Sequence, residues 1–305
     1  MSFVIGIDGG GTSCRAALAT SDGRILARAK SGSANIHSDW TGARANIVAA
    51  ARKAFVEAGE DPGLIPRTPA VLGLAGANVG TYQQQLEAIL PFSTSVVETD
   101  ALIALEGAVG AGDGAIAILG TGTAYLARMG GEQKPIGGWG FLIGDQASGA
   151  RIGRDLLEET LLAHDGIREA SPMTEAVMAI YRDDPRDMVE FTLGAKPGDF
   201  GGYAPMVFDY AAKGDAVANA IVDRATAAIE ASLRALNLHA DHPLCLLGGL
   251  APLYAPRLSA DFQPLLREPL QDALGGAVAM AARLFGAAND ADASHSQGGA
   301  GNRRS

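Results

Sequence analysis

The chain has 305 residues, which is enough for two domains of the usual ~100–200 residues. Its apolar content of 48% and its formal net charge of −10 fit a well-cored globular protein. They argue against nucleic acid as the main partner, since phosphate backbones are bound by clustered Lys and Arg. The sequence has neither a basic leader nor a run of ~18 apolar residues, so we predict neither secretion nor contact with a membrane.

Glycine and cysteine content narrow the class further. The 40 glycines are dispersed without a period, which excludes fibrous and low-complexity proteins and indicates many tight turns. Cys14 and Cys245 each lie in an apolar run, so we predict buried free thiols instead of a disulfide. A reducing cytoplasm is the expected compartment.

In the N-terminal half, alternating and apolar runs predict three strands followed by alternating helices and strands, a pattern typical of an α/β domain with a mixed sheet. In chain order these are strands over 3–8, 15–20 and 24–30, a helix over 41–58, a strand over 70–76, a helix over 81–90, a strand over 94–99 and a helix from Asp100. The first domain is expected to cover residues 1–110.

The C-terminal half repeats this plan. Strands are predicted over 115–122, 123–129, 133–140 and about 243–247, and helices over 147–164, 174–181, 186–193, 215–236 and 271–285. We assign residues 111–286 to the second domain. The polar, glycine-rich residues 287–305 are predicted to form a flexible tail.

A run of glycines behind Asp8 separates the first two strands, within Val4–Ala19. Backbone N–H groups that no side chain crowds can point at phosphate oxygens, so this hairpin is a candidate nucleotide-phosphate site. It is not a Walker loop, because no lysine follows the glycines in that pattern. It is not a dinucleotide fingerprint either, because Cys14 stands where the third glycine belongs. A glycine turn without a ligand stays an alternative.

A second hairpin of the same kind lies in Ala115–Met129. There the turn contains Gly120, Thr121, Gly122 and Thr123, which offer hydroxyl groups beside backbone donors. The recurrence favours two similar halves with phosphates bound between them.

Five motifs in order, DGGGT, TDA, GTGT, GGWGFLIGD and LLGGLA, resemble the BadF/BadG/BcrA/BcrD-type ATPase family of the actin, Hsp70 and sugar-kinase superfamily. The resemblance covers about Phe3 to Gly286 and is strongest to N-acetylglucosamine kinases and their glucosamine kinase relatives. It implies an α/β fold with two similar actin-like (ribonuclease H-like) lobes, each a mixed sheet flanked by helices, with an interdomain cleft. The final helix is expected to pack back towards the first lobe.

The resemblance implies ATP- and Mg²⁺-dependent phosphorylation of the 6-hydroxyl of N-acetyl-D-glucosamine, a small-molecule amino sugar. Glucosamine kinase is an alternative that the sequence does not separate. Two further classes are an ATPase module without a sugar acceptor and, more remotely, a sugar sensor without catalysis. The sequence does not set the oligomeric state, and a homodimer is left open.

The resemblance assigns the two acidic roles in the first lobe. Asp100, in TDA, is the implied general base for the sugar hydroxyl, although Asp before a helix is more often an N-cap. Asp8 is the implied Mg²⁺ ligand, directly or through water, with an Asx-type turn as the alternative.

Nucleotide contacts are implied for both hairpins and for a late glycine pair. They fall on Gly9, Gly10, Gly11 and Thr12, on Thr121, Gly122 and Thr123, and, on the adenosine side, on Gly248 and Gly249. Turn stabilisation by the threonines and an ordinary strand-end turn at the glycine pair are the alternatives.

Sugar contacts are implied for Asn35 and for the segment around GGWGFLIGD. Asp145 is the implied ligand of a sugar hydroxyl, and Gly138, Trp139 and Gly140 shape the pocket floor. The alternatives are turn chemistry for Asn35, helix capping for Asp145 and core packing for Trp139.

Overall fold

The computed structural model describes residues 2–35, 39–77 and 82–297. These residues form two compact units. Unit 1 contains the described residues up to Gly112 together with those from Pro269 onward, and unit 2 contains Asp113–Glu268. The final helix therefore belongs to unit 1.

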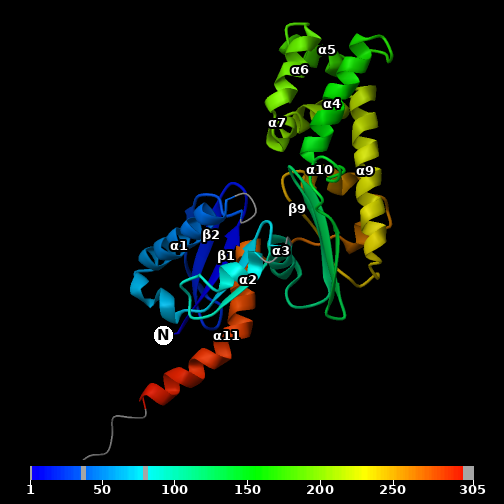
Figure 1. Cartoon of the computed structure of the whole chain (residues 1–305). Coiled ribbons are helices and arrows are strands. Elements are labelled where there is room, and N and C mark those ends of the chain that lie inside the picture. Colours follow the sequence, from blue (N-terminus) through cyan, green and yellow to red (C-terminus); the bar gives the residue numbers. More distant parts are fainter. Residues whose placement is uncertain (1, 36–38, 78–81, 298–305) are drawn as a thin grey trace, which may run out of the picture. The chain divides into compact units, whose positions relative to one another are not determined.

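Unit 1 is built on a five-stranded mixed sheet (Figure 1). Its strands are β1 (Phe3–Gly9), β2 (Cys14–Thr20), β3 (Ile25–Ser31), β4 (Ala70–Leu74) and β5 (Ser95–Thr99), in the order β3-β2-β1-β4-β5. The first three strands are antiparallel, whereas β1, β4 and β5 run parallel. Because parallel strands end at one edge of a sheet, the residues that follow β1, β4 and β5 lie at the same edge.

Helices cover both faces of this sheet (Figure 1). They are α1 (Trp40–Glu57), α2 (Tyr82–Glu87), α3 (Asp100–Val109) and α11 (Ala273–Gln297), with a 3-10 helix at Pro62–Arg67. Ile5 and Ile7 of β1 share a core with α1. The intervening Gly6 lies against α11, where an added Cβ would be 2.6 Å from Cγ2 of Val278. The absence of a side chain at Gly6 thus allows α11 to pack closely on the sheet.

Unit 2 contains a four-stranded mixed sheet. Its strands are β6 (Gly114–Leu119), β7 (Thr123–Met129), β8 (Glu132–Gly137) and β9 (Leu244–Leu247), in the order β8-β7-β6-β9. An antiparallel meander followed by one strand parallel to its first member repeats the arrangement of β1–β4. The α/β fold class with two mixed sheets flanked by helices is confirmed.

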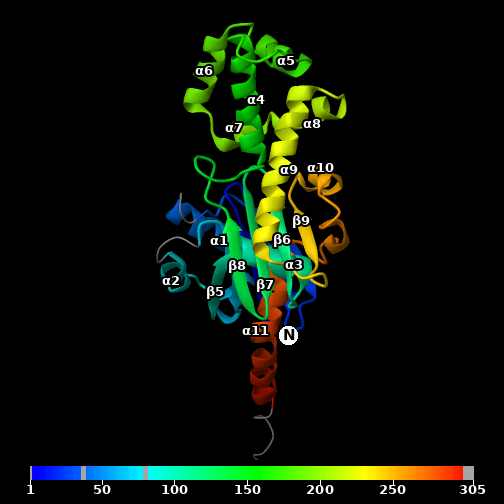
Figure 2. The ribbon, with the colours of Figure 1, turned by 90° about the vertical axis from the view of Figure 1, so that its right-hand side faces the viewer.

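Most helices of unit 2 lie beyond one end of its sheet, whereas α9 also runs along the sheet (Figure 2). They are α4 (Gly149–His164), α5 (Pro172–Ile180), α6 (Pro185–Gly194), α7 (Pro197–Gly201), α8 (Ala204–Ala212), α9 (Ala216–Leu236) and α10 (Ala251–Tyr254), with 3-10 helices at Ala255–Arg257 and Gln263–Leu265. The long helix α9 packs on β7 and β8 and buries Ile221, Ile229 and Leu233 in the core. This is the amphipathic stripe that its sequence predicts.

Three details concern the sequence-based predictions. The prediction of a strand over 133–140 was too long: β8 ends at Gly137, because Gly137, Gly138 and Gly140 have positive φ angles and turn the chain away from the sheet. Cys14 and Cys245 are buried free thiols, as predicted. Among the described residues, none of the helices combines the length and apolarity that crossing a membrane requires.

Candidate functional site

Asp100 lies at the carboxyl end of the parallel strands of unit 1, in the first turn of α3. The N-cap of α3 is Thr99, whose side chain accepts the N–H of Leu102 at 3.2 Å. The interpretation of Asp100 as the cap was therefore wrong. Its exposed side chain accepts the N–H of Ala101 at 2.9 Å and is available to a ligand.

The surroundings of Asp100 make it a stronger base than an ordinary aspartate. Although Asp100 has an accessible surface, the protein atoms around its carboxyl group reduce the hydration of that group and raise its pKa, and the negative charge of Asp8 raises it further. The hydrogen bond from Ala101 acts in the opposite direction without cancelling the rise. A general base works best when its pKa approaches the working pH, so the direction suits proton abstraction.

Asp8 lies near the end of β1, next to the glycine turn. An arginine that we did not predict from the sequence binds its carboxylate. Arg15, its cross-strand partner on β2, donates to Oδ2 of Asp8 from both Nε (3.0 Å) and Nη2. Arg15 also donates to Asp272 at 3.1 Å, and Arg28 donates to the same carboxylate at 3.2 Å. This contact could have been found from the sequence, because Asp8 and Arg15 face each other in the predicted hairpin. The network fixes the Asp8 carboxylate beside the glycine turn.

The first glycine turn contains glycines of two kinds. Gly9 is required by packing, since a Cβ there would lie 2.5 Å from Cδ2 of Leu74. Gly10 and Gly11 have no positive φ, and a Cβ would meet nothing nearer than 3.8 Å at Gly10 and nothing within 4 Å at Gly11. The protein's own geometry therefore does not require glycine at these two positions. Thr12 beside them is exposed.

Asn35 lies after β3 and is half-buried. Residues 36–38, which follow it, are outside the described residues. Its predicted contact with the sugar stays a prediction.

The second glycine turn, Gly120–Gly122, is supported from behind by the start of α4. The carbonyl oxygen of Gly120 accepts the N–H of Gly149 at 2.8 Å, and that of Thr121 accepts the N–H of Ala150 at 3.3 Å. Thr121 is exposed, whereas Thr123 is buried and its hydroxyl donates to the carbonyl oxygen of Gln146 at 2.9 Å. The Thr123 hydroxyl thus has a structural partner within unit 2.

Asp145 is brought onto this second turn. The N-cap of α4 is Ser148, so the interpretation of Asp145 as the cap was wrong. A Cβ at Gly122 would lie only 2.8 Å from Oδ2 of Asp145, which shows how closely the carboxylate lies over the turn. Loss of hydration raises the pKa of Asp145, although N–H groups of Thr123 and Gly140 and the charge of Arg151 oppose the rise.

The loop before Asp145 exposes large apolar side chains. Trp139 is 76% exposed, Leu142 84% and Ile143 81%. The interpretation of Trp139 as a core residue was therefore wrong. Gly138 and Gly140 flank Trp139 with φ angles of 73° and 83°, a conformation that side chains rarely adopt. The loop can present an aromatic face and aliphatic groups to a ligand.

The two glycines of the late pair, Gly248 and Gly249, also differ in whether the fold requires a glycine at their position. Gly248 has a φ of 95°, and a Cβ there would lie 2.4 Å from the carbonyl oxygen of Leu119, so the strand-end turn explains it. A Cβ added at Gly249 would have no neighbouring atom within 4 Å. Of this pair, only Gly249 is a glycine that the packing of the fold does not explain.

A family model, the BadF/BadG/BcrA/BcrD ATPase family, matches residues 5–263. The chain belongs to this family. The matched range includes the glycine turns, Asp100, Asp145 and the late glycine pair.

Relatives of this family member include two curated kinases. Glucosamine kinase GspK of Vibrio cholerae is 36% identical over 284 residues, which are 93% of this chain and 97% of the relative. N-acetyl-D-glucosamine kinase of Dictyostelium discoideum is 30% identical over 270 residues, 80% of this chain and 84% of the relative.

Solved structures show the same fold. A proposed N-acetylglucosamine kinase of Chromobacterium violaceum is 32% identical, with a TM-score of 0.83 over 91% of this chain and 98% of that one. A ROK family glucokinase of Streptomyces griseus, solved with glucose and AMPPNP, is 20% identical with a TM-score of 0.55 over 92% and 98% of the two chains. The second likeness concerns the fold alone.

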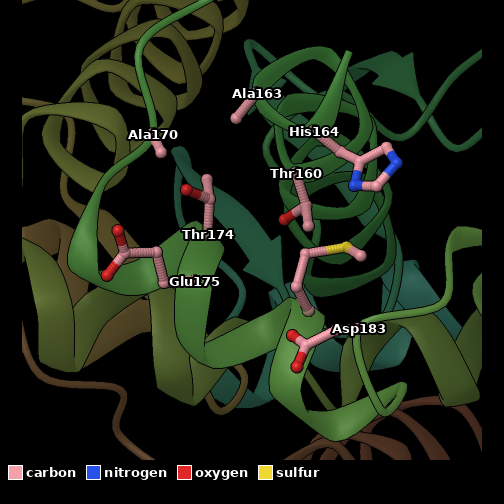
Figure 3. Close-up of a pocket in the computed structure, with 8 residues that line it drawn as sticks. Thr160, Ala163, His164, Ala170, Thr174, Glu175 and Asp183 are labelled. Carbon is pink, nitrogen blue, oxygen red and sulfur yellow. The ribbon is translucent and has the colours of Figure 1, made fainter. Parts of the chain in front are cut away.

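A separate hollow in this family member lies between α4 and α5 and encloses about 220 Å³ (Figure 3). His164, Glu175 and Asp183 line it, and the residues that the sequence singles out do not.

In the part of the chain that the structure describes, no group of three or more His, Cys, Asp and Glu side chains is arranged to hold a metal ion.

Proposed function

We propose that this protein is an ATP-dependent kinase that transfers the γ-phosphoryl group to the 6-hydroxyl of an amino sugar, with N-acetyl-D-glucosamine as the preferred acceptor. Family membership and the two curated relatives support an amino-sugar kinase. The observation that carries the proposal is the placement of Asp100. Its carboxylate is accessible at the carboxyl edge of the sheet, near Asp8, and does not cap the helix that follows it.

Phosphates would be bound by backbone N–H groups of the two glycine turns. Gly10 and Gly11 support this role, since the fold itself gives no reason for glycine there. Gly249, outside these turns, would leave space on the adenosine side of the nucleotide. Thr12 and Thr121 are exposed and would add hydroxyl donors. In the second turn, Gly120–Gly122, the main donors to phosphate would be the backbone N–H of Gly122 and the backbone N–H and hydroxyl group of Thr121.

The residues present fit a hydrated Mg²⁺ ion. Mg²⁺ in nucleotide sites commonly binds one or two carboxylates, several waters and the phosphates themselves. Nε and Nη2 of Arg15 both donate to Oδ2 of Asp8. Oδ1 is therefore left to accept a hydrogen bond from a water molecule bound to the ion. The bound ion would share the charge of the phosphates.

Asp100 would orient the 6-hydroxyl and accept its proton as the oxygen attacks the γ-phosphorus. Asp145 would accept hydrogen bonds from other sugar hydroxyls. The exposed loop with Trp139 would contact the apolar face of the ring and the methyl of the acetyl group. This last contact is our reason to place N-acetylglucosamine before glucosamine.

Glucosamine kinase is the second candidate, because the Vibrio cholerae relative with 36% identity carries that name. The two sugars differ at position 2, where glucosamine has an ammonium group and N-acetylglucosamine has a neutral amide. A site that holds the acetyl group loses those contacts with glucosamine, whereas a site built for the ammonium group would need a carboxylate against it.

A coupled ADP-release assay over hexoses and amino sugars tests the proposal. We expect turnover with N-acetylglucosamine, and a kcat/KM at least about tenfold lower with glucosamine, the usual order for one lost apolar contact. The reverse preference would establish the second candidate. ATP hydrolysis that no sugar stimulates would overturn the kinase and favour an ATPase module.

The variant Asp100→Asn tests the base. Loss of a general base lowers turnover by about 10²–10⁴-fold, so we expect kcat to fall within this range while sugar binding survives. Asp22→Asn is the matched control, because Asp22 lies in the turn between β2 and β3 of the same unit. Near-normal turnover of Asp100→Asn would remove Asp100 from the mechanism.

A further inference from the structure

The segment Gly144–Ala147, which carries Asp145, has every one of its four carbonyl oxygens bound. The donors come from three places in unit 2. At the start of α4, Nη1 of Arg151 donates to Gly144 (3.2 Å) and N–H of Ser148 to Asp145 (3.0 Å); Oγ1 of Thr123 in β7 donates to Gln146 (2.9 Å), and the hydroxyl of Tyr254 in α10 to Ala147 (2.9 Å). Such complete bonding is unusual for a connection between a strand and a helix, since loop carbonyls usually face water.

This bonding coincides with an uncommon backbone conformation. Asp145 and Ala147 have φ angles of 55° and 68°, in the left-handed region that residues other than glycine seldom adopt. Left-handed residues of this kind persist where the surrounding structure holds them, and they concentrate at functional sites. The four donors supply that restraint, and the restraint fixes the Asp145 carboxylate over Gly122.

Tyr254 is the most distant of these donors in sequence, 107 residues from Ala147. Its side chain is 0% exposed, and its ring packs edge-on against Phe208 with 5.3 Å between centroids. Burial raises the pKa of the Tyr254 hydroxyl, so it keeps its proton and donates at any working pH. The hydroxyl is therefore a rigid donor to a buried carbonyl.

We infer that Tyr254 is a positioning residue for the amino-sugar site: its hydroxyl holds the Asp145 segment in the left-handed conformation that presents the carboxylate to the sugar. This inference rests on the proposed role of Asp145 in sugar binding. Without the hydroxyl, the Ala147 carbonyl loses its partner, and the segment can relax to an ordinary conformation that turns Asp145 away from Gly122.

The test compares Tyr254→Phe with Tyr181→Phe. The control also removes one hydroxyl from a buried tyrosine of unit 2, where the partner is the hydroxyl of Tyr203. We expect Tyr254→Phe to raise the KM for the amino sugar about ten- to a hundredfold, the size expected when a ligand loses a hydrogen bond to a charged group. The KM for ATP should stay within about twofold, and Tyr181→Phe should leave both constants within that range.

A merely structural role for Tyr254 predicts a different outcome. Both phenylalanine variants would then lower the thermal midpoint alike, and neither would change the sugar KM relative to the ATP KM. That result would overturn the inference. An equal rise in both KM values for Tyr254→Phe would do so too.

Asp145→Asn, measured alongside, separates the two proposals. If it raises the sugar KM and Tyr254→Phe does not, only the role of Tyr254 is wrong. If it has no effect, the assignment of Asp145 fails, and the positioning role for sugar binding fails with it.

A spectroscopic readout then tells whether Tyr254 still holds the segment. With Trp40→Phe as background, Trp139 is the one tryptophan left in the chain. A Cβ at Gly144 would lie 2.9 Å from Cβ of Trp139, so the emission of Trp139 reports on the segment. Tyr254→Phe should shift this emission and Tyr181→Phe should not. An unchanged spectrum for both would show that the hydroxyl does not hold the segment.

Discussion

The two glycine turns share a position in their sheets but differ in how they are supported. In unit 1, the turn after β1 is held by one internal hydrogen bond, from Gly10 N–H to the Ser13 carbonyl oxygen (2.9 Å). The carbonyl oxygen of Gly10 accepts the N–H of Ala34 (3.0 Å) and the hydroxyl of Ser33 (3.4 Å). Gly11 and Thr12 project from the turn as exposed residues. In unit 2, the start of α4 donates to the turn, and the Asp145 carboxylate lies directly over Gly122.

The difference teaches that a similar hairpin can serve two purposes. The open turn of unit 1 has room to adjust to the phosphates of the proposed nucleotide site. The supported turn of unit 2 also sets the place of an acidic side chain, which belongs to the proposed sugar site. Substitutions by alanine in the two turns should therefore have effects of different kinds.

Among the substitutions in the two turns, the largest effect is expected from Gly122→Ala. Its methyl group would meet Oδ2 of Asp145 at 2.8 Å, so the carboxylate must move from its two backbone donors. We expect the sugar KM to rise by about 10²-fold, since a hydrogen bond to a charged group contributes about 1.5–3 kcal/mol. Steady-state kinetics with the amino sugar and with ATP varied in turn provide the measurement.

Gly120→Ala is the control for that variant within the same turn. The nearest atom to its added Cβ is the carbonyl oxygen of Gly122, at 4.0 Å, and its φ is not positive. A sugar KM that rises as much in Gly120→Ala as in Gly122→Ala would contradict the contact with Asp145.

A smaller and different effect is expected from Gly11→Ala. Nothing lies within 4 Å of the added Cβ, so the thermal midpoint should stay unchanged or rise slightly. A methyl group on the open turn should hinder the phosphates and raise the KM for ATP about tenfold, which corresponds to about 1.4 kcal/mol. The sugar KM should change little.

Gly194→Ala controls for the substitution itself. Gly194 ends α6, also has nothing within 4 Å of an added Cβ and lacks a positive φ. Normal ATP kinetics in both variants would argue that the first turn does not bind phosphate.

Gly248→Ala should instead lower the thermal midpoint, because its backbone conformation and the Leu119 carbonyl oxygen both exclude a side chain.

Much of this arrangement could be predicted from the sequence because its signals are local. Apolar runs and glycine turns placed most strands of both sheets, and the spacing of apolar residues predicted α9. The helices α7 and α8 were missed, since glycines and prolines over 197–205 indicate turns when read without their tertiary contacts.

The supporting residues of the site could not be predicted in the same way. The bond from Tyr254 to Ala147 joins residues 107 positions apart, and no local pattern marks such a pair. Arg15 is an intermediate case. It faces Asp8 across a predicted hairpin, so the register of the two strands contained the information.

The smallest expected effect is a change in stability, and it concerns the two carboxylates themselves, Asp100 in unit 1 and Asp145 in unit 2. Both have a raised pKa that two backbone N–H groups oppose, but the positive charge of Arg151 also opposes the rise at Asp145, whereas the negative charge of Asp8 adds to the rise at Asp100. A carboxyl group with a higher pKa in the folded than in the unfolded state binds its proton more tightly when folded. Its contribution to stability therefore falls as pH rises from the unfolded value of about 3.9 through the raised one.

Neutralising Asp100 should therefore stabilise the protein at neutral pH while it abolishes turnover. We expect Asp100→Asn to raise the thermal midpoint at pH 7 by about 1–2 °C, and Asp145→Asn to raise it less, since the amide leaves its donors poorly matched. The gain from Asp100→Asn should shrink as the pH falls towards 4, where the wild-type carboxyl also becomes neutral. In the wild-type enzyme, kcat/KM should fall on the acid side at a pH above the ordinary aspartate pKa, because the base must be ionised. A lower midpoint for Asp100→Asn at pH 7 would show that Asp100 supports the fold instead of the reaction.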